Sequence, residues 1–189
     1  MSDQLVLFED TRVPDGLRYQ AAFATRDEER ALIARFAALA LAPFRFGAFE
    51  GKRRVASFGF RYDYTEQRLR NAEPLPDWIC PFARRVAAFA SLPDDAVQQV
   101  LFTEYEAGVG IGWHRDKAAF DLVFGLSLAS ACKLRFRRKE AGRWERFTLD
   151  AAPRSLYLIG AQARSAWEHS IPPVEALRYS ITFRTMARR

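Results

Sequence analysis

From residue 97 onward the chain is a series of short extended segments, and this pattern constrains the fold more than any other feature. The segments are rich in β-branched and aromatic residues, and Gly, Pro, Asp or Glu-Ala-Gly turns separate them. They read QQVLFTEY, DLVFGLSLA, CKLRFRRK, RWERFTLD, RSLYLIG and RYSITFRTM. Runs of strands at this spacing are typical of a barrel or a two-sheet jelly roll. We therefore expect a single β core in the second half of the chain.

Two helices are predicted before this core. The first lies in TRDEERALIARFAALALAP, where Thr25 and Glu28 fit a capping box and Pro43 is expected to end the helix. Its apolar stripe is formed by Leu32, Ile33, Phe36 and Leu39. A second helix is expected over about residues 79–91, after the Pro-spaced loop RNAEPLPDW. Both helices would brace the outside of the β core, which makes the fold class α+β.

The composition is that of one globular domain with an excess of basic residues. The 189 residues include 29 Lys and Arg against 23 Asp and Glu, a net charge of +6 that suits a polyanion such as nucleic acid. Cys80 and Cys132 are too few for a disulfide framework or a thiolate zinc site, as expected in a reducing cytosol. The opening MSDQLVLFED lacks the features of a secretory signal. We expect a cytoplasmic monomer with no membrane partner.

The chain contains two histidines, and the first stands in GIGWHRDKAAFD. His114 and Asp116 are two residues apart, so in an extended segment their side chains point to the same face and can bind one ion. His169 follows a predicted strand and turn, where a jelly roll could bring it beside the first pair. Two imidazoles and one carboxylate form the facial triad that holds non-haem Fe(II). Zinc also accepts these ligands, so they alone leave an oxygenase and a hydrolase open.

The last predicted strand, RYSITFR, alternates strictly between apolar and polar residues. One face would hold Leu177, Tyr179, Ile181 and Phe183, and the other Arg178, Ser180, Thr182 and Arg184. An edge strand with a solvated basic face is one interpretation. The other is a polar cavity, because Arg is well shaped to hold a carboxylate with two parallel hydrogen bonds. An iron site beside two such arginines indicates a dicarboxylate co-substrate.

The motif His114-x-Asp116, then His169, then Arg178-x5-Arg184 resembles the signature of the AlkB family of Fe(II)/2-oxoglutarate-dependent dioxygenases. TEYEAGVGIGWHRD and SLYLIGAQARSAWEHSI are similar to the family's segments around the two histidines. The likeness covers about residues 53–186. It implies one domain over residues 1–189, with helical support over about 1–52, a substrate-recognition lid over about 53–75 and a double-stranded β-helix (jelly roll) core over about 97–186.

The resemblance also implies the roles of individual residues. His114, Asp116 and His169 would be the catalytic iron ligands. The side chains implied to bind 2-oxoglutarate are Arg178, Arg184 and Tyr105, together with Thr103 and Ser180, which stand where the family has Asn and can still hydrogen-bond. With Fe(II), 2-oxoglutarate and O2, such an enzyme oxidises a substrate C–H bond. An N-methyl group on a DNA or RNA base would then leave as formaldehyde, with succinate and CO2 as the other products.

A base inside a duplex cannot reach a buried iron, so it must be flipped out or come from a single strand. Alternation would place Phe58, Phe60, Tyr62 and Tyr64 on one face where the family has its nucleotide-recognition lid. We expect Phe58 and Tyr62 to contact the base, with Arg61 beside them. The arginines that could bind phosphates are Arg53, Arg54, Arg61, Arg68 and Arg70.

Other residues near the motif are expected to have different roles. Trp113 and Trp167 could wall the metal pocket or fill the barrel, and core filling is the prediction. Ala118 stands where the best-known bacterial DNA repair enzyme of the family has an acidic residue, so base recognition is expected to differ. Because some family members act on RNA, transfer RNA or proteins, a protein or small-molecule substrate stays open. A third possibility is a non-catalytic module that binds nucleic acid.

Overall fold

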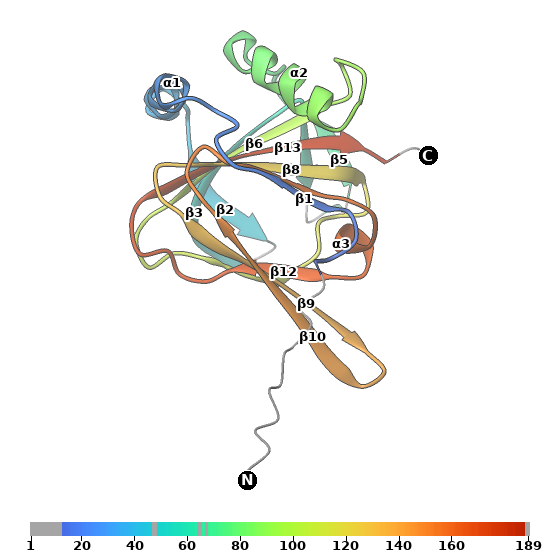
Figure 1. Ribbon diagram of the computed structural model, residues 1–189. Helices are drawn as coiled ribbons and strands as arrows, with labels where there is room; N and C mark the ends of the chain where they lie inside the picture. Colours follow the sequence, from blue (N-terminus) through green and yellow to red (C-terminus); the bar gives the residue numbers. More distant parts are fainter. Residues whose placement is uncertain (1–12, 47–48, 64–65, 67, 188–189) are drawn as a thin grey trace.

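The computed structural model describes residues 13–46, 49–63, 66 and 68–187, and two facing sheets dominate it (Figure 1). The large sheet has seven strands in the spatial order β1-β11-β8-β13-β6-β3-β2. Their bounds are β1 Leu17–Gln20, β2 Ala42–Phe46, β3 Phe49–Phe58, β6 Gln99–Tyr105, β8 Phe120–Leu128, β11 Leu156–Ile159 and β13 Arg178–Met186.

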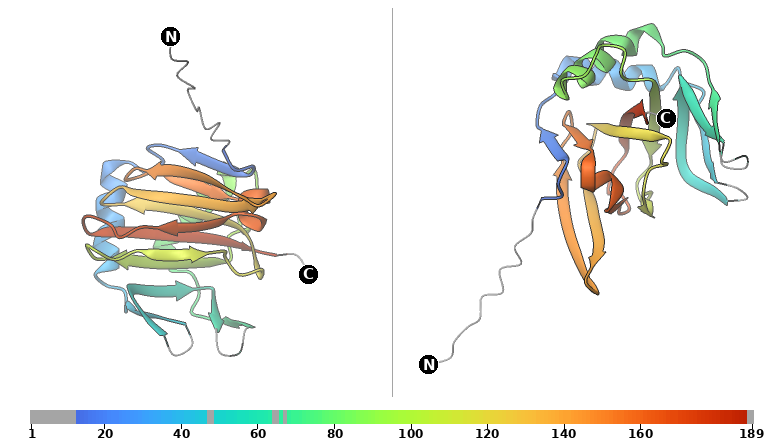
Figure 2. Two further views of the ribbon diagram at one scale, coloured as in Figure 1. Left: turned by 90° about the horizontal axis from the view of Figure 1, so that it is seen from below. Right: turned by 90° about the vertical axis from the view of Figure 1, so that its right-hand side faces the viewer.

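The small sheet has four strands in the order β10-β9-β12-β7. These are β7 Ile111–His114, β9 Cys132–Glu140, β10 Arg143–Ala151 and β12 Glu168–Ile171. A separate pair, β4 Phe60–Asp63 and β5 Arg68–Asn71, lies beside the large sheet. The strand pairings of both sheets are antiparallel, and the two sheets face each other as in a jelly roll (Figure 2). The predicted fold class is therefore confirmed.

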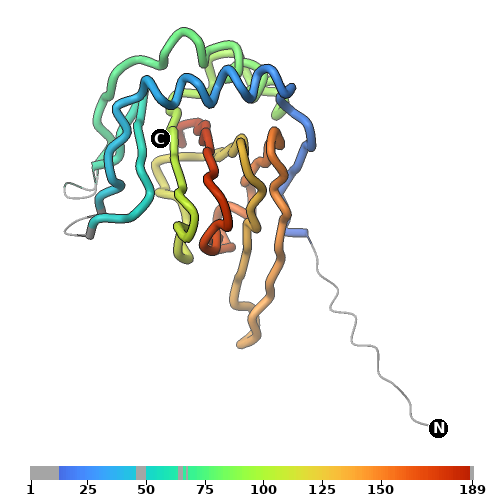
Figure 3. Tube along the Cα trace, turned by 90° about the vertical axis from the view of Figure 1, so that its left-hand side faces the viewer, coloured from blue at the N-terminus to red at the C-terminus, as the bar shows by residue number. Residues whose placement is uncertain are grey.

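Helices α1 Arg26–Phe36 and α2 Cys80–Phe89 lie across one face of the large sheet (Figure 3). Phe36 of α1 packs edge-on against Phe102 of β6, with ring centroids 5.4 Å apart, and against Tyr179 of β13 at 4.5 Å. Ile181 and Phe183 of β13 are fully buried in the same layer. The apolar face that alternation predicted for β13 is thus the one that packs on the helices, which leaves its polar face for the space between the sheets.

Both predicted helices are present, but their ends and connections differ from expectation. Helix α1 begins with the predicted capping box at Thr25 and Glu28, and α2 follows a short 3-10 turn, η1 Asp77–Ile79. The prediction that Pro43 ends α1 is wrong, because the helix ends at Phe36 and Pro43 lies in β2. The short helix α3 Ala161–Ser165 and strands β1, β7 and β12 were not predicted as separate elements.

Gly59 divides the aromatic segment, whose alternation was expected to place its rings on one face. Its φ of +77° is left-handed, and a Cβ at this position would lie 2.1 Å from the carbonyl oxygen of Gln98. The chain turns here, so Phe58 ends β3 in the large sheet while Phe60 and Tyr62 belong to β4. The expectation that these rings share one face is wrong, because they lie in two strands of different sheets. Tyr64 lies outside the described residues.

The expected N-terminal support, residues 1–52, contains more than helix in its described part. Strands β1 and β2 and the start of β3 lie there beside α1 and join the large sheet. Among the described residues, no helix has both the length and the apolar character that a membrane crossing requires.

The capping box of α1 gives a stability prediction. The backbone N–H of Glu28 donates to Thr25 Oγ1 at 3.1 Å, and the N–H of Thr25 donates to Glu28 Oε2 at 2.8 Å. We expect Thr25→Ala to lower the free energy of unfolding by about 1 kcal/mol, since it leaves a helix N–H without its partner. Urea denaturation followed by circular dichroism measures this change. Thr25→Ser keeps the hydroxyl and should stay close to wild type; equal losses in both variants would contradict the capping role.

Candidate metal centre and co-substrate site

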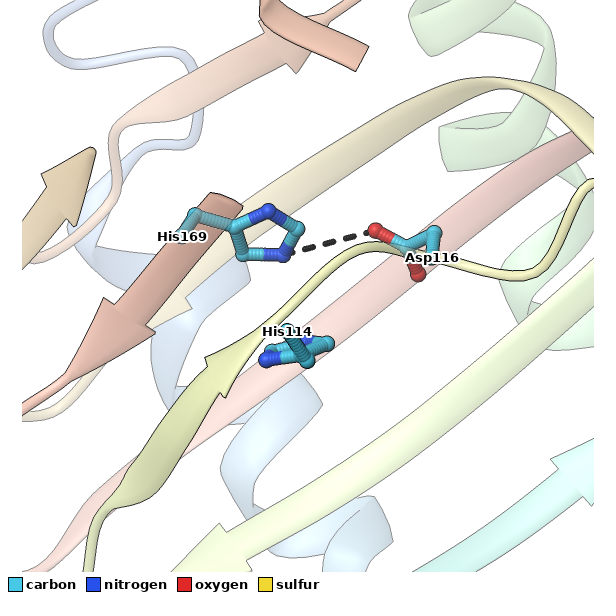
Figure 4. A group of neighbouring side chains, drawn as sticks. All are labelled: His114, Asp116 and His169. Carbon is cyan, nitrogen blue, oxygen red and sulfur yellow. Dashed lines mark ion pairs between the residues drawn. The ribbon is translucent and has the colours of Figure 1, made fainter. Parts of the chain in front are cut away.

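Three side chains that are distant in sequence meet between the two sheets. His114 is the last residue of β7, Asp116 follows in the next loop, and His169 lies in β12. Strands β7 and β12 are neighbours, and His169 pairs in register with His114. One potential ligand atom from each residue lies within 4.8 Å of the others, and the side chains point toward a common centre (Figure 4). This is the group that the His-x-Asp motif and the distant His predicted.

The orientation of His114 is set by a backbone hydrogen bond. Its Nδ1 lies 2.8 Å from the carbonyl oxygen of Gly112. Because a carbonyl oxygen can only accept, Nδ1 carries the proton and donates it. Nε2 is then the nitrogen with a free lone pair, and the ring is held with that lone pair available to a metal ion.

The two carboxylate oxygens of Asp116 have different surroundings. Its Oδ1 accepts a hydrogen bond from Arg184 Nη2 at 3.0 Å. Its Oδ2 is buried, has no hydrogen-bond partner among the described residues and lies 3.4 Å from His169 Nε2. Burial by itself would raise the pKa of this carboxyl, but the positive charge of Arg184 outweighs it and the pKa lies well below its usual range. Asp116 is therefore an ionised carboxylate with one oxygen available.

His169 is buried and is held neutral at physiological pH. Burial lowers its pKa to about 4, although the nearby charge of Asp116 acts in the opposite direction. A neutral imidazole is the form that binds a metal ion. Phe136 packs beside it with ring centroids 6.0 Å apart, so the wall behind the histidine is apolar.

The polar face of β13 forms the other side of this site. Arg178 pairs in register with Tyr105 of β6, and Ser180 pairs with Thr103. Arg178 is fully buried, and its Nε donates to Ser127 Oγ at 3.3 Å. Its two terminal nitrogens, Nη1 and Nη2, have no hydrogen-bond partner among the described residues. A buried guanidinium with two unused donor groups is arranged to receive an anion.

A cavity of about 1280 Å³ connects these groups. The predicted site residues that line it are His114, Asp116, His169, Arg184, Tyr105, Thr103, Ser180, Phe58, Arg61 and Tyr62. Arg178 is buried next to this wall, with its guanidinium carbon 5.1 Å from the centre of the Tyr105 ring. The structure thus brings the predicted metal ligands, the base contacts and all the predicted co-substrate residues except Arg178 to one cavity.

The flanking residues fall into two groups. Phe58 lines the cavity but also packs edge-on against Phe102, at 5.7 Å between centroids, so part of its ring belongs to the core. Arg53 and Arg61 line the cavity, whereas three other arginines expected to bind phosphates form ion pairs within the chain: Arg54 with Glu104, Arg68 with Glu66, and Arg70 with Asp63.

The two tryptophans also differ from each other. Trp167 is 3% exposed, as expected for a core residue. Core filling is wrong for Trp113, which is half-buried and is among the residues that line the cavity; the guanidinium carbon of Arg137 lies 4.3 Å from its ring centre. Ala118 is exposed and is not one of the residues that line the cavity.

Two site residues were missed in the sequence. Tyr157 of β11 lines the cavity, and its ring lies so close to Gly125 that a Cβ there would be 2.1 Å from Tyr157 Cζ. Only its hydroxyl in an otherwise apolar strand could have indicated this position. Arg164 of α3 donates to the carbonyl oxygens of Lys117 and Phe120, at 2.5 and 3.0 Å, and thereby holds the loop after Asp116. It was missed because α3 itself was not predicted.

The ligand geometry predicts that metal binding depends on His169 but not on Arg115, the exposed residue between His114 and Asp116. We expect His169→Ala to weaken Mn(II) binding by at least about 100-fold, since it removes a ligand outright. Titration calorimetry of the purified chain measures the dissociation constant. Arg115→Ala is the control, because the Arg115 side chain is directed to the carbonyl oxygen of Ala166 at 3.3 Å. Unchanged affinity in His169→Ala would rule out this site.

Comparisons with known proteins agree with this geometry. The family model of the 2OG-Fe(II) oxygenase superfamily matches residues 24–184. A curated relative, the alkylated DNA repair protein ALKBH8 homolog of Arabidopsis thaliana, is 33% identical over 148 residues, which cover 64% of this chain and 42% of the relative. The chain thus spans less than half the length of that relative.

Solved structures share the fold at low sequence identity. OsALKBH1 superposes with a TM-score of 0.72 at 14% identity, covering 92% of this chain and 98% of the other. A Pseudomonas putida prolyl-4-hydroxylase has a TM-score of 0.59 at 18% identity, covering 92% and 94%. The superfamily uses Fe(II), 2-oxoglutarate and O2, and His114, Asp116 and His169 could bind the iron. The relative and the first of these structures are AlkB homologues by name, and this chain is similar to them. The chain belongs to the 2OG-Fe(II) oxygenase superfamily.

Proposed function

We propose that this oxygenase removes alkyl groups from the nitrogen atoms of DNA or RNA bases. The observation that supports this most is the lining of the cavity that contains the metal ligands. Away from those ligands, aromatic rings and cations line the same cavity: Phe44, Phe58, Tyr62, Arg45, Arg53, Arg61, Arg115 and Lys117. Outside the metal group, the only acidic side chain among the described residues that line the cavity is Glu73. Rings that can stack on a base, with cations for the adjacent phosphates, suit a nucleotide.

The residues present fit the cofactors of the family. Asp116 Oδ2 and His114 Nε2 are available as ligands, and His169 is neutral. The unpaired terminal nitrogens of Arg178 fit a carboxylate of 2-oxoglutarate, and Thr103 and Ser180 line the adjoining cavity. When bound, Fe(II) and 2-oxoglutarate supply, with O2, the oxidation of a C–H bond. The task of the chain is to hold the co-substrate and the base and to exclude water.

The side chains around the metal group have separable tasks in this proposal. Arg184 holds Asp116 Oδ1, so that the other carboxylate oxygen stays turned toward the histidines. Tyr62 presents one ring to the cavity, and Lys117 lies 5.1 Å from the centre of that ring. A base that is flipped out or single-stranded would stack on such a ring, with its sugar and phosphates near Arg53 and Arg61.

The proposal is tested with methylated DNA and RNA oligonucleotides. With Fe(II), 2-oxoglutarate and air, we expect succinate and formaldehyde to form and the oligonucleotide to lose a methyl group, as measured by mass spectrometry. The Asp116→Ala variant and unmethylated strands serve as controls and should give background levels. Succinate formation that depends on peptides or small molecules, but on no methylated strand, would select an oxygenase with another substrate. Strand binding without any succinate would select a non-catalytic module.

Arg178 gives a prediction in which stability and ligand binding change in opposite directions. Because its guanidinium is buried with two unpaired nitrogens, we expect Arg178→Met to leave the free energy of unfolding unchanged or raise it by about 1 kcal/mol. We expect the stabilisation by 2-oxoglutarate with Mn(II) to be lost in the same variant. Thermal denaturation with and without 2-oxoglutarate measures both effects. A variant that 2-oxoglutarate still stabilises as strongly as wild type would show that Arg178 does not hold it.

A further inference from the structure

Much of the net charge of the chain lies in one hairpin. Residues 132–151, which form β9, β10 and their turn, contain seven Lys and Arg against three Asp and Glu. This is a net charge of +4, compared with +6 for the whole chain. The hairpin extends past the body of the molecule on the side away from α1 and α2 (Figures 1 and 3). The metal site does not account for this concentration of charge.

The small sheet has two chemically different faces. Leu134 and Phe136 of β9 are buried toward the space between the sheets, on the side of His169. Because neighbouring residues of a strand point to opposite faces, Arg135 and Arg137 lie on the other side, as does Trp113 next to His114. We call this side the outer face of the small sheet. Its basic and aromatic residues are Trp113, Arg135, Arg137, Lys139, Trp144 and Arg146.

Tryptophan rings and guanidinium groups alternate across this face. Arg137 lies between two rings, with its guanidinium carbon 4.3 Å from the centre of Trp113 and 4.8 Å from that of Trp144. Its Nε donates to Glu168 Oε2 at 2.8 Å, which fixes the group in place. Trp144 is 45% exposed. The outer face therefore presents a held tryptophan ring, nearly half accessible, at the centre of the basic hairpin.

Two cations on this face have no ionic partner within the described residues, and one of them lies opposite another cation. Arg146 pairs in register with Arg137, and like charges directly opposite each other on a sheet are destabilising. Lys139 pairs in register with Trp144. Within the described part of the chain, neither Arg146 nor Lys139 has an ion-pair partner. A bound polyanion would relieve the repulsion between the two arginines.

We propose that the outer face of the small sheet binds a single strand of nucleic acid, with phosphates on Arg146 and Lys139 and a base stacked on Trp144. A duplex keeps its bases stacked inside and would not use the exposed ring, and an acidic peptide has no flat ring to place on it. The choice of nucleic acid as the partner of this surface rests on the proposed function. It lies on the opposite side of the sheet from the metal ligands, so it would hold a strand outside the cavity.

The test is strand binding without iron or 2-oxoglutarate, so its outcome is independent of catalysis. The probe is a fluorescent, unmodified single strand of roughly 15 nucleotides, measured by anisotropy over a range of salt concentrations. We expect the double variant Lys139→Ala/Arg146→Glu to reduce the slope of log affinity against log salt by about 1.4, since two phosphate contacts are lost. We expect Trp144→Ala to weaken binding of this strand about tenfold and to leave binding of an abasic strand unchanged.

The matched control removes the same charge from the helical layer. Arg26→Ala/Arg84→Glu changes two exposed residues of α1 and α2 and should keep wild-type affinity and salt slope. Thermal denaturation should show Arg146→Glu to be at least as stable as wild type, because the new carboxylate faces Arg137. The proposal would be overturned if the control variant lost as much strand affinity as the hairpin variants, or if the hairpin variants lost none. It would also be overturned if Trp144→Ala weakened binding of the abasic strand as much as binding of the intact strand. If the strand-binding results are as expected but no demethylation is detected, the proposed function alone is overturned.

Discussion

The ion pair between Arg184 and Asp116 connects the two sheets at the metal site. Arg184 belongs to β13 in the large sheet, and Asp116 follows β7 of the small sheet. Arg184 also donates to Gln99 Oε1 at 2.8 Å; Gln99 donates to Ser57 Oγ at 2.8 Å. Ser57 then donates to the carbonyl oxygen of Phe60 at 2.8 Å. A continuous chain of hydrogen bonds therefore joins the carboxylate to the turn where β4 begins.

This chain of contacts explains why the site is polar in a mostly apolar interior. A buried carboxylate without a charged partner would take up a proton, whereas beside Arg184 the charged form is the stable one. Arg178 is different, because its Nη1 and Nη2 have no hydrogen-bond partner among the described residues. One arginine of β13 thus completes the protein's own structure, and the other is left with capacity for a ligand.

Much of this arrangement could be predicted from the residues. The alternation of RYSITFR shows which face of β13 is polar, and the two-residue spacing of His114 and Asp116 shows that their side chains point the same way. Both predictions need only the geometry of an extended segment. The pairing of His169 with His114 depends on which strands become neighbours, so the resemblance to a family was needed to expect it. For Tyr157 the hydroxyl was the one signal in the sequence, because the position of its ring depends on the absence of a side chain at Gly125 in the neighbouring strand.

The places where prediction failed have local physical causes. The aromatic segment around Gly59 has the alternation of one strand, but a single left-handed residue divides it into strands of two different sheets. Pro43 was expected to end α1, yet the helix has already ended at Phe36, and proline is tolerated in the short strand β2 at the edge of the large sheet. Neither outcome is visible in a pattern of apolar residues.

The opposite faces of the small sheet restrict how this chain can vary. A one-residue insertion in β12 before His169 would turn the histidine outward and bring a neighbour such as Glu168 into the cavity. The same slip would remove Glu168 from Arg137 on the outer face. By contrast, the turn between β9 and β10, where Ala141 and Gly142 have positive φ, lies at the far end of the hairpin. The length of that turn can therefore vary without moving the metal ligands. A change in the length of β7 or β12 would disturb the side chains on both faces of the small sheet.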